Sequence, residues 1–418
     1  SSETLGLLYK LHWPYYQYET ARNKIQSPLH DILKSNGACF GEAAGWERPN
    51  WYTSTNQEAK YEYSYGRQNW FENVREECDA VRSNMGLFEL TSFSKFIIKG
   101  KDSTNYLNHV CVSNMDTSIG KVTYTQLLNE DAGTEADITI TRLENNKYLY
   151  VTAPTSHNKD LFWLQFHSKK FKNLEITDVT KNYGCLSLMG PRSRAFLQTL
   201  LNVDISNESI PFGYSKKVKI NSVECLLSRI TYVGELGFEI YVPYKNIRDI
   251  FNLIFNEGKR EDLKLAGYHA LNSLRTEKGY LHWGHDITVE ENPYEAGVGF
   301  CVNMEKDNFL GKKALKDRIK TVPSKRKINL SLSDNNLLLY HNEPIFFDGE
   351  SVGEITSGMY GFSLDKSLGR GYISSTDQYS IEDMLELQKF EIEFAGYRYI
   401  ADGSVKSFYD PKREKILS

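Results

Sequence analysis

The chain has 418 residues, of which 40% are hydrophobic and 25% are charged, and its formal net charge is −4. This length exceeds a single ordinary hydrophobic core, so the sequence predicts two or three packed units. The weak negative charge argues against a nucleic-acid or anionic-membrane partner, and no apolar run approaches the roughly 20 residues that a membrane helix needs. Aromatic residues make up 13% of the chain, enough for several cores and an aromatic-lined ligand pocket.

The six cysteines are widely spaced and form no CxxC pair. Without an evident signal peptide, this spacing favours reduced thiols, and we expect a cytoplasmic location, or the mitochondrial matrix in a eukaryote. The nine histidines show neither HExxH nor HxxxH spacing, so no metal site is predicted. The chain also has no GxGxxG motif after a strand and no GxxxxGK[ST] motif, which excludes the common nucleotide-binding fingerprints.

Residues 1–58 read as a lead-in segment packed on the body of the protein rather than as a domain. They contain a short capped helix, SPLHDILKSNG, and an aromatic stretch, GWERPNWY, that we expect to be an ordered loop. Apolar residues at helical spacing predict a helix over 70–90, and 94–100 is typical of a strand. Alternating apolar and polar residues predict three antiparallel strands, over 121–128, 137–143 and 147–153.

The second half of the chain continues with mixed elements. The stretch CLSLMG predicts a strand that meets a helix at Pro191. Further strands are expected in KKVKI, ECLLSRITYV and GFEIYVP, and helices in KNIRDIFNLIFNEG and YHALNSLRTEKGY. After a charged linker over 310–325, short strands with frequent glycine predict a small β-barrel or a jelly roll. We therefore place the body at 59–315 and the barrel domain at 316–418.

Asp137 lies inside one of the expected strands, in the stretch AGTEADITI. Aspartate is uncommon in strands, and a carboxylate is costly to bury without a partner. Its side chain therefore points either to water, as an ordinary polar-face residue, or toward a ligand. The pattern of neighbouring residues is compatible with both.

The stretch ITYVGELGFEIYV predicts two strands joined by a tight turn at its glycines, with Glu235 at the tip. Glu239 alternates with Phe238 and Ile240, so it faces a different surface from these apolar neighbours. A carboxylate there suits a flat fork of N–H donors, such as that of a 2-amino-4-oxo-pterin, with Tyr232 positioned to stack on the ligand. The alternative is a surface hairpin with a solvated glutamate.

Arg275 lies on a predicted helix in SLRTEKGYLHWGHDI. It is suited to bind a substrate carboxylate, and equally suited to form an ion pair within the helix or between domains. His285 and Asp286 follow a glycine, and we expect them either to line a cleft or to have a structural role.

The chain resembles the folate-binding half of the dimethylglycine and sarcosine dehydrogenases in eight motifs that occur in the same order. They are WERPNWY, LFELTSFSKFIIKG, AGTEADITITRL, YVGELGFEIYVP, LNSLRTEKGYLHWGHDI, NPYEAGVGF, KDNFLGKKAL and ITSGMYGFSLDKSLGRGYI. That half is similar to the glycine-cleavage T-protein, an aminomethyltransferase. The resemblance runs from about residue 10 to the C-terminus.

The resemblance implies an α+β, three-domain, disc-like fold with tetrahydrofolate in a central channel and a small C-terminal β-barrel. The body would consist of two interleaved α+β domains that bind the folate. The resemblance implies Asp137 as the catalytic residue beside the folate nitrogens. It implies Tyr232 and Glu239 as cofactor-binding residues, in the pattern Y-x-G-E-x-G-x-E. Arg275 and Tyr280 match the helix that follows and are carried over as cofactor-binding residues.

The resemblance also implies an activity, namely tetrahydrofolate-dependent one-carbon transfer from an N-methyl amine of the dimethylglycine or sarcosine type, giving 5,10-methylenetetrahydrofolate. No flavin site is visible in this chain, so a preceding flavin domain, a separate flavoprotein subunit or a flavin-free activity is expected. One alternative is a flavin-free demethylase of the dimethylsulfoniopropionate type, which would give 5-methyltetrahydrofolate. Another is a non-catalytic regulatory subunit of the same fold.

Overall fold

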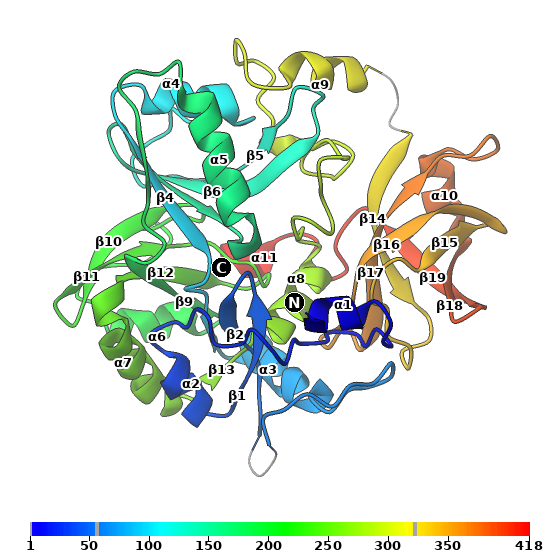
Figure 1. Ribbon diagram of the computed structural model, residues 1–418, viewed down its shortest axis with the longest axis horizontal. Coiled ribbons are helices and arrows are strands. Elements are labelled where there is room, and N and C mark those ends of the chain that lie inside the picture. Colours follow the sequence, from blue (N-terminus) through cyan, green and yellow to red (C-terminus); the bar gives the residue numbers. More distant parts are fainter. Residues whose placement is uncertain (1, 55–57, 321–323) are drawn as a thin grey trace.

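The computed structural model describes residues 2–54, 58–320 and 324–418, which form three main units (Figure 1). A five-stranded sheet, a six-stranded sheet and a closed barrel each have their own hydrophobic core. The predicted α+β class and the C-terminal barrel are therefore confirmed, and the closure of the barrel excludes the jelly-roll alternative.

The five-stranded sheet is antiparallel, in the order β5-β6-β7-β4-β8, and its pairing confirms the three strands predicted between 121 and 153. One face is apolar because every second residue is branched or aromatic, and this face is buried under two helices. The elements are β4 (Ser94–Lys99), β5 (Val122–Leu128), β6 (Thr134–Glu144), β7 (Lys147–Thr152), β8 (Glu175–Asp178), α4 (Ser103–Val110) and α5 (His157–Ser168).

The six-stranded sheet has the order β10-β11-β12-β9-β3-β13, and only the β13–β3 pair is parallel among its described pairs. The amphipathic helix α7 packs its apolar side on one face together with α6 and α2. The elements are β3 (Gly86–Glu89), β9 (Tyr183–Met189), β10 (Ser215–Ile220), β11 (Val223–Ser228), β12 (Gly237–Pro243), β13 (Lys264–Leu265), α2 (His30–Ser35), α6 (Ser193–Thr199) and α7 (Ile247–Lys259).

The barrel closes in the order β14-β17-β16-β15-β18-β19. A helix that begins at a Ser380 capping box, α10, covers part of its core. Its elements are β14 (Lys325–Leu332), β15 (Pro344–Phe347), β16 (Glu350–Gly361), β17 (Lys366–Ser374), β18 (Phe390–Phe394), β19 (Tyr397–Ser404) and α10 (Ile381–Leu387). After β19 the chain returns to the centre of the molecule, where α11 (Glu414–Leu417) lies (Figure 1).

Two helices, α3 (Phe71–Ser83) and α8 (Tyr268–Lys278), pack against each other. On its other sides, α8 contacts β2, β16 and β17, so it joins the lead-in segment to the barrel. The lead-in segment forms α1 (Ser2–Leu7) and a hairpin, β1 (Ala38–Ala43) and β2 (Trp46–Tyr52).

Three local expectations are wrong. The stretch GWERPNWY is mainly strand β2, with Trp51 completely buried, rather than a loop. The helix predicted over 70–90 ends at Ser83, because the apolar run after it pairs with β9 as a buried strand. The expected linker contains helix α9 (Lys312–Arg318), which is anchored by the buried side chain of Leu315; residues 321–323 of that linker lie outside the described residues.

Candidate functional site

Asp137 and Glu239 project from the facing sides of the two sheets. On β6, Ile138 is buried beneath α4 and α5, so the neighbouring Asp137 points to the opposite face. On β12, Phe238 and Ile240 are buried against α6 and α7, so Glu239 also points to the other side of its sheet. The alternation predicted for Glu239 is confirmed, and the surface-hairpin alternative is wrong.

These two opposite faces meet in one shared core. Leu149 and Val151 of β7 pack in the same cluster as Leu226 of β11 and Tyr241 of β12. We call the region that these four residues define the inter-sheet layer. Both carboxylates are half-buried and face this layer, so two distant segments of the chain direct acidic groups into one interior region.

Asp137 has a polar environment but no counter-ion. The Gln126 amide donates to Asp137 Oδ1 at 2.8 Å, from the directly opposite position on β5. Burial raises the pKa of Asp137 to about 6, although the Tyr124 hydroxyl and the Gln126 amide act to lower it. The oxygen of the same amide, Gln126 Oε1, is buried without a hydrogen-bond partner among the described residues. Such a carboxylate titrates near neutral pH and is suited to accept a proton.

Glu239 lies in a polar row with unused hydrogen-bonding groups. The Tyr241 hydroxyl donates to Glu239 Oε2 at 2.6 Å, and burial raises the pKa of Glu239 while the charge of Lys95 lowers it. Ser187 and Ser228 are its direct cross-strand neighbours on β9 and β11. Both serine hydroxyls are buried and have no partner within the described parts of the chain. Because buried polar groups are normally satisfied, this row is suited to a polar ligand.

Tyr232 and Tyr280 stack on each other, with ring centroids 5.9 Å apart and an interplanar angle of 13°. The Tyr232 hydroxyl donates to the carbonyl of Leu281 at 2.5 Å. Burial raises the pKa of Tyr232 to about 12. Tyr232 packs on the same cluster as Leu149 and Val151 of β7, so it borders the inter-sheet layer that Asp137 faces.

The segment between β11 and β12 is not the predicted tight turn. It spans eight residues and packs against α8, where a side chain at Gly234 would meet Lys278, and its φ of +80° favours glycine. Glu235 is not at an exposed tip, since its exposed fraction is 1%. It instead pairs with Arg82 Nη1 at 3.3 Å.

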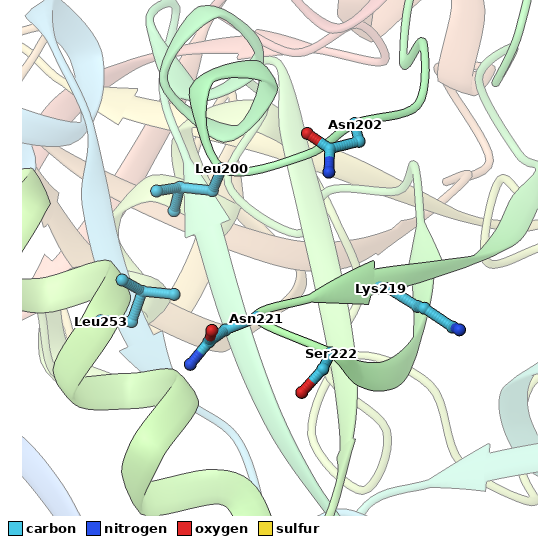
Figure 2. Close-up of a pocket in the computed structure, with 6 residues that line it drawn as sticks. All are labelled: Leu200, Asn202, Lys219, Asn221, Ser222 and Leu253. Atoms are coloured by element: carbon cyan, nitrogen blue, oxygen red, sulfur yellow. The ribbon is translucent and has the colours of Figure 1, made fainter.

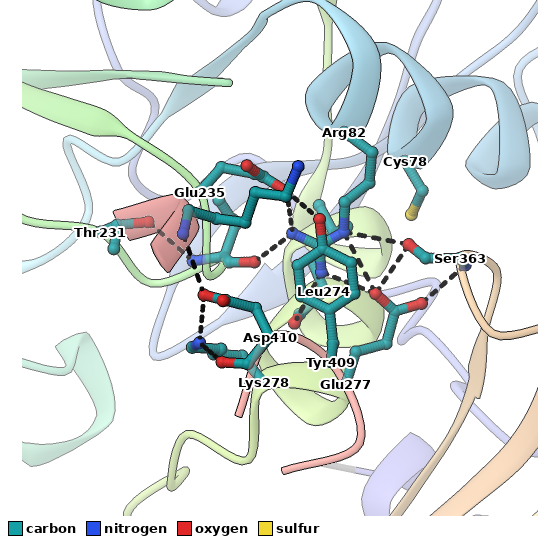
Figure 3. Close-up of polar contacts among 12 residues, drawn as sticks. Cys78, Arg82, Thr231, Glu235, Leu274, Glu277, Lys278, Ser363, Tyr409 and Asp410 are labelled. Atoms are coloured by element: carbon teal, nitrogen blue, oxygen red, sulfur yellow. Dashed lines mark hydrogen bonds and ion pairs between the residues drawn. The ribbon is translucent and has the colours of Figure 1, made fainter. Parts of the chain in front are cut away.

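Arg82 is the centre of a second polar cluster, shown in Figure 3. Its guanidinium pairs with Glu277 at 2.6 Å and donates to the carbonyl of Val233 at 2.6 Å. The ring of Tyr409 lies 3.7 Å from the guanidinium carbon and its hydroxyl donates to Glu235. Lys278 pairs with Asp410 at 2.8 Å in the same region. We call this group the Arg82 cluster; it joins α3, α8 and the chain that follows the barrel.

Arg275 is buried and its contacts are those of the ion-pair alternative. Its Nη1 atom pairs with Asp286 at 2.5 Å, its Nη2 atom donates to Ser357 at 3.1 Å, and its Nε atom donates to Asn272 at 2.7 Å. Asp286 is completely buried and accepts a further bond from Lys327 at 2.9 Å, so it has a structural role. Cofactor binding by Arg275 and Tyr280 stays a prediction.

An open groove elsewhere on the molecule is not a competing site (Figure 2). It has a volume of about 590 Å³ and lies between the β10–β11 turn, α7 and the end of α6. Its lining residues are all exposed or half-buried, and Lys219 is the only charged one. These residues are Leu200, Asn202, Lys219, Asn221, Ser222 and Leu253. No group of three potential metal ligands occurs among the described residues, and no described helix has the length and apolarity to cross a membrane.

Comparison with known proteins decides the family. Residues 29–306 match the family model of the GCVT N-terminal domain, and residues 325–410 match that of the Glycine cleavage T-protein C-terminal barrel domain. The chain belongs to the glycine cleavage T-protein family. The resemblance inferred from the eight sequence motifs is therefore confirmed.

Similar proteins include enzymes of two kinds. The 4-methylaminobutanoate oxidase (formaldehyde-forming) of Paenarthrobacter nicotinovorans is 38% identical over 417 residues, covering 100% of this chain and 50% of the oxidase. The mitochondrial dimethylglycine dehydrogenase of Rattus norvegicus is 33% identical and covers 90% of this chain and 43% of the dehydrogenase. The chain thus spans about half the length of these relatives. An aminomethyltransferase of Caldanaerobacter subterraneus is 31% identical, covering 84% of this chain and 89% of that protein.

The fold has a solved counterpart. The crystal structure of the glycine cleavage system aminomethyltransferase T from Bartonella henselae superposes with a TM-score of 0.79 at 24% identity, covering 93% of this chain and 99% of that one. The aminomethyltransferase fold expected from the motifs is confirmed.

Several polar residues of the site were missed at the level of sequence. Ser187 sits between two leucines in a strand pattern, and Ser228 ends a strand, which are unremarkable positions when they are read along the chain. Gln126 is likewise one polar residue of an alternating strand. Only the pairing of strands reveals that these three flank the two carboxylates.

Proposed function

We propose that this chain catalyses tetrahydrofolate-dependent transfer of a one-carbon unit from an N-methyl amine of the dimethylglycine or sarcosine type, giving 5,10-methylenetetrahydrofolate. The observation that carries the proposal is the pair of half-buried carboxylates, Asp137 and Glu239, that face one layer from two sheets. The names of the similar oxidase and dehydrogenase support a methylated-amine substrate, and the similar aminomethyltransferase supports a transfer reaction.

The residues present suit a pterin. Glu239 has one carboxylate oxygen bonded to Tyr241 and no hydrogen bond to the other among the described residues. The unpartnered hydroxyls of Ser187 and Ser228 lie directly on either side of it. A pterin ring presents adjacent N–H donors and acceptors in one plane, and a carboxylate flanked by hydroxyls is complementary to such an edge. Tetrahydrofolate would supply the nitrogen atoms that accept the carbon.

Asp137 would stabilise a positive charge on the substrate nitrogen and accept a proton. Nitrogen carries a positive charge when an N-methyl amine is oxidised, and a fixed carboxylate in a region of low polarity stabilises such a charge strongly. With a pKa of about 6, Asp137 is mainly ionised at pH 7 and remains basic enough to accept a proton. The Gln126 amide helps to fix its orientation through Oδ1, and the Tyr124 hydroxyl is a second hydrogen-bonding neighbour of the carboxylate.

Glu239 and the half-buried position of the site would contribute orientation of the pterin and exclusion of water. Glu239 would orient the pterin, because an attacking atom held near contact distance reacts far faster than one that is free in solution. Exclusion of water from the layer would protect an oxidised amine from hydrolysis to formaldehyde. Oxidation of the amine is assigned to a flavoprotein, either a preceding flavin domain or a separate subunit.

The test supplies the oxidised amine from outside. The full chain is incubated with tetrahydrofolate and dimethylglycine in the presence of a flavoprotein amine oxidase, and formaldehyde and folate products are separated by chromatography. We expect the chain to divert carbon from formaldehyde to 5,10-methylenetetrahydrofolate faster than a reaction without the chain. Asp137→Asn should lose this effect while still binding tetrahydrofolate.

Two results would contradict the proposal. Formation of 5-methyltetrahydrofolate from an onium donor, without any oxidase, would identify the flavin-free demethylase. Failure of the chain to bind tetrahydrofolate in a calorimetric titration would favour the non-catalytic role.

A further inference from the structure

Three buried cations surround a single buried carboxylate at the interface between α8 and the barrel. Asp286 has an exposed fraction of 0%, and the exposed fractions of Arg275, Lys327 and Arg370 are 2%, 5% and 4%. We call these four residues the Asp286 cluster. Buried charges are normally paired, because an uncompensated charge in a region of low polarity is costly.

The carboxylate of Asp286 is already fully used. Its Oδ2 atom accepts from Arg275 and from the backbone N–H of His282, and its Oδ1 atom accepts from Lys327 and Thr356. Those four donors occupy the acceptor positions of a carboxylate. Asp286 therefore leaves no oxygen for the third cation.

Arg370 is that third cation, and its guanidinium lacks partners. Its Nε and Nη1 atoms are buried and make no hydrogen bond to any described residue. Its cross-strand neighbours on β14 and β16 are Asn329 and Ser357. The Ser357 hydroxyl is already bonded to Arg275, and the Asn329 amide nitrogen donates to the carbonyls of Ser404 and Lys406, while the Asn329 amide oxygen is also buried without a partner among the described residues. Two N–H groups of Arg370 are thus available to a ligand.

The position of Arg370 connects it to the candidate site. On β17, Ile373 points into the barrel core, so Arg370 points outward, to the side where α8 packs. Ser357, the cross-strand neighbour of Arg370, accepts from Arg275, and the Arg275 Nη1 atom donates to the carbonyl of Tyr280 at 3.3 Å. Tyr280 stacks on Tyr232, so Arg370 lies on the barrel side of this tyrosine pair.

We propose that Arg370 is a carboxylate-binding residue at the barrel side of the folate site, and that its ligand is the carboxylate of an N-methylated amino acid. A carboxylate can accept a hydrogen bond from the unpartnered Nε or Nη1 atom and would bring the Asp286 cluster closer to charge balance. This inference rests on the proposed function for the identity of the amine. The glutamate group of folate carries the same chemistry and is the other source that the test must separate.

The first test compares ligands that differ only in the carboxylate. Calorimetric titrations of the full chain use dimethylglycine against dimethylethanolamine, and tetrahydrofolate against tetrahydropteroate, which lacks the glutamate. We expect Arg370→Met to abolish a preference for dimethylglycine of about 10- to 100-fold. Arg370→Lys should retain part of it, because the charge remains but the planar guanidinium with its fixed N–H directions is lost. If only the preference for tetrahydrofolate over tetrahydropteroate collapses, the carboxylate is that of folate.

The second test separates binding from a structural role. Arg82→Met is the matched control, because Arg82 is a nearly buried arginine with carboxylate partners. We expect Arg370→Met to raise the melting temperature of the ligand-free chain, and Arg82→Met to lower it. A lower melting temperature for Arg370→Met, with all ligand preferences unchanged, would overturn the inference.

The carboxylate site can be tested even if the proposed function is wrong. If the wild-type chain does not bind tetrahydrofolate, acetate serves as a plain carboxylate probe in thermal-shift measurements. Stabilisation of the wild-type chain by acetate that is lost in Arg370→Met supports the carboxylate site alone. Equal stabilisation of both proteins contradicts it.

Discussion

The Arg82 cluster and the Asp286 cluster are both buried beside α8, yet their charges are balanced differently. In the first, three carboxylates, those of Glu235, Glu277 and Asp410, face two cations. In the second, one carboxylate faces three cations, and the guanidinium of Arg370 has free nitrogens. Cations that have partners hold elements together, whereas a buried charge without a partner costs stability and has to be explained by a ligand.

The same difference is found among the carboxylates, between Asp137 and Glu277. It is a half-buried carboxylate without a cation, while Glu277 is buried and paired with Arg82. Removal of a buried, paired charge should destabilise the protein strongly, and removal of an unpaired buried charge should remove function but leave or improve stability.

The largest expected loss follows from Asp286→Asn. This change removes the carboxylate that pairs with Arg275 and Lys327 and leaves three uncompensated cations in a buried interface. We expect the free energy of unfolding to fall by about 4 kcal/mol. Urea denaturation measures it, and a loss below about 1 kcal/mol would show that the cluster is not tightly packed.

Arg82→Met should have the next largest effect. Glu235 and Glu277 would lose their cation, and we expect a loss of about 3 kcal/mol in the free energy of unfolding. The double variant Arg82→Met, Glu277→Gln is the control, because it removes the stranded charge together with its partner. It should be more stable than Arg82→Met alone; strictly additive losses would contradict a direct pair.

Asp137→Asn tests the unpaired carboxylate. Loss of the charge should reduce carbon transfer about a hundredfold or more. The raised pKa of about 6 means that the folded state holds the proton more tightly than the unfolded state. Wild-type stability therefore falls as pH rises from about 4 to about 6, and the asparagine variant should avoid a loss of roughly 3 kcal/mol.

Stability curves of both proteins between pH 4 and pH 8 check this sign. The difference in favour of Asp137→Asn should shrink toward pH 4, where the folded wild-type chain holds the proton and the unfolded chain is about half protonated. A variant that is less stable than the wild-type chain at pH 7 would place Asp137 among the paired, structural charges.

Glu239→Gln should weaken binding of tetrahydrofolate while leaving the strand intact. The amide keeps the shape of the side chain but exchanges an ionised acceptor for a neutral one. We expect the dissociation constant to rise about 30-fold, corresponding to about 2 kcal/mol. Ser187→Ala, on the neighbouring strand, should weaken binding less, and equal dissociation constants for Glu239→Gln and the wild-type chain would remove Glu239 from the site.

The smallest effect is expected at the surface. Arg248 forms two hydrogen bonds to Asp31, and both side chains are exposed. Because solvent and salt screen such pairs, Arg248→Ala should shift the melting temperature by no more than about 1 to 2 °C. A larger shift would show that exposure is a poor guide to the value of a charge in this protein.

Much of the site could be predicted from local pattern, since the strand period alone sets the direction of a side chain. Glu239 faces away from Phe238 and Ile240 for this reason, and the motif around Asp137 marks it as a candidate. The partners could not be predicted, because pairing of β12 with β9 and β11 is a property of the folded sheet. Ser187 and Ser228 become candidate site residues only once their positions beside Glu239 are known.

The errors in the predicted elements have a related cause. The run after Ser83 is apolar and fits either a longer helix or a new strand, and pairing with β9 decides between them. Arg370 was not singled out, because its lack of hydrogen-bond partners becomes apparent only in the folded interface. Arg275 and Arg370 are equally basic in sequence, and only the geometry around Asp286 shows that one is satisfied and the other is not.

The chain that follows β19 has a consequence for access to the interior. Tyr409 and Asp410 attach it to Arg82 and Lys278, while α8 packs directly on β16 and β17. The barrel is therefore fastened to the rest of the molecule at several places, which also include the ion pair of Lys325 with Glu291, and a swinging motion would have to break them together. A ligand that enters the interior is therefore expected to do so without a movement of the whole barrel.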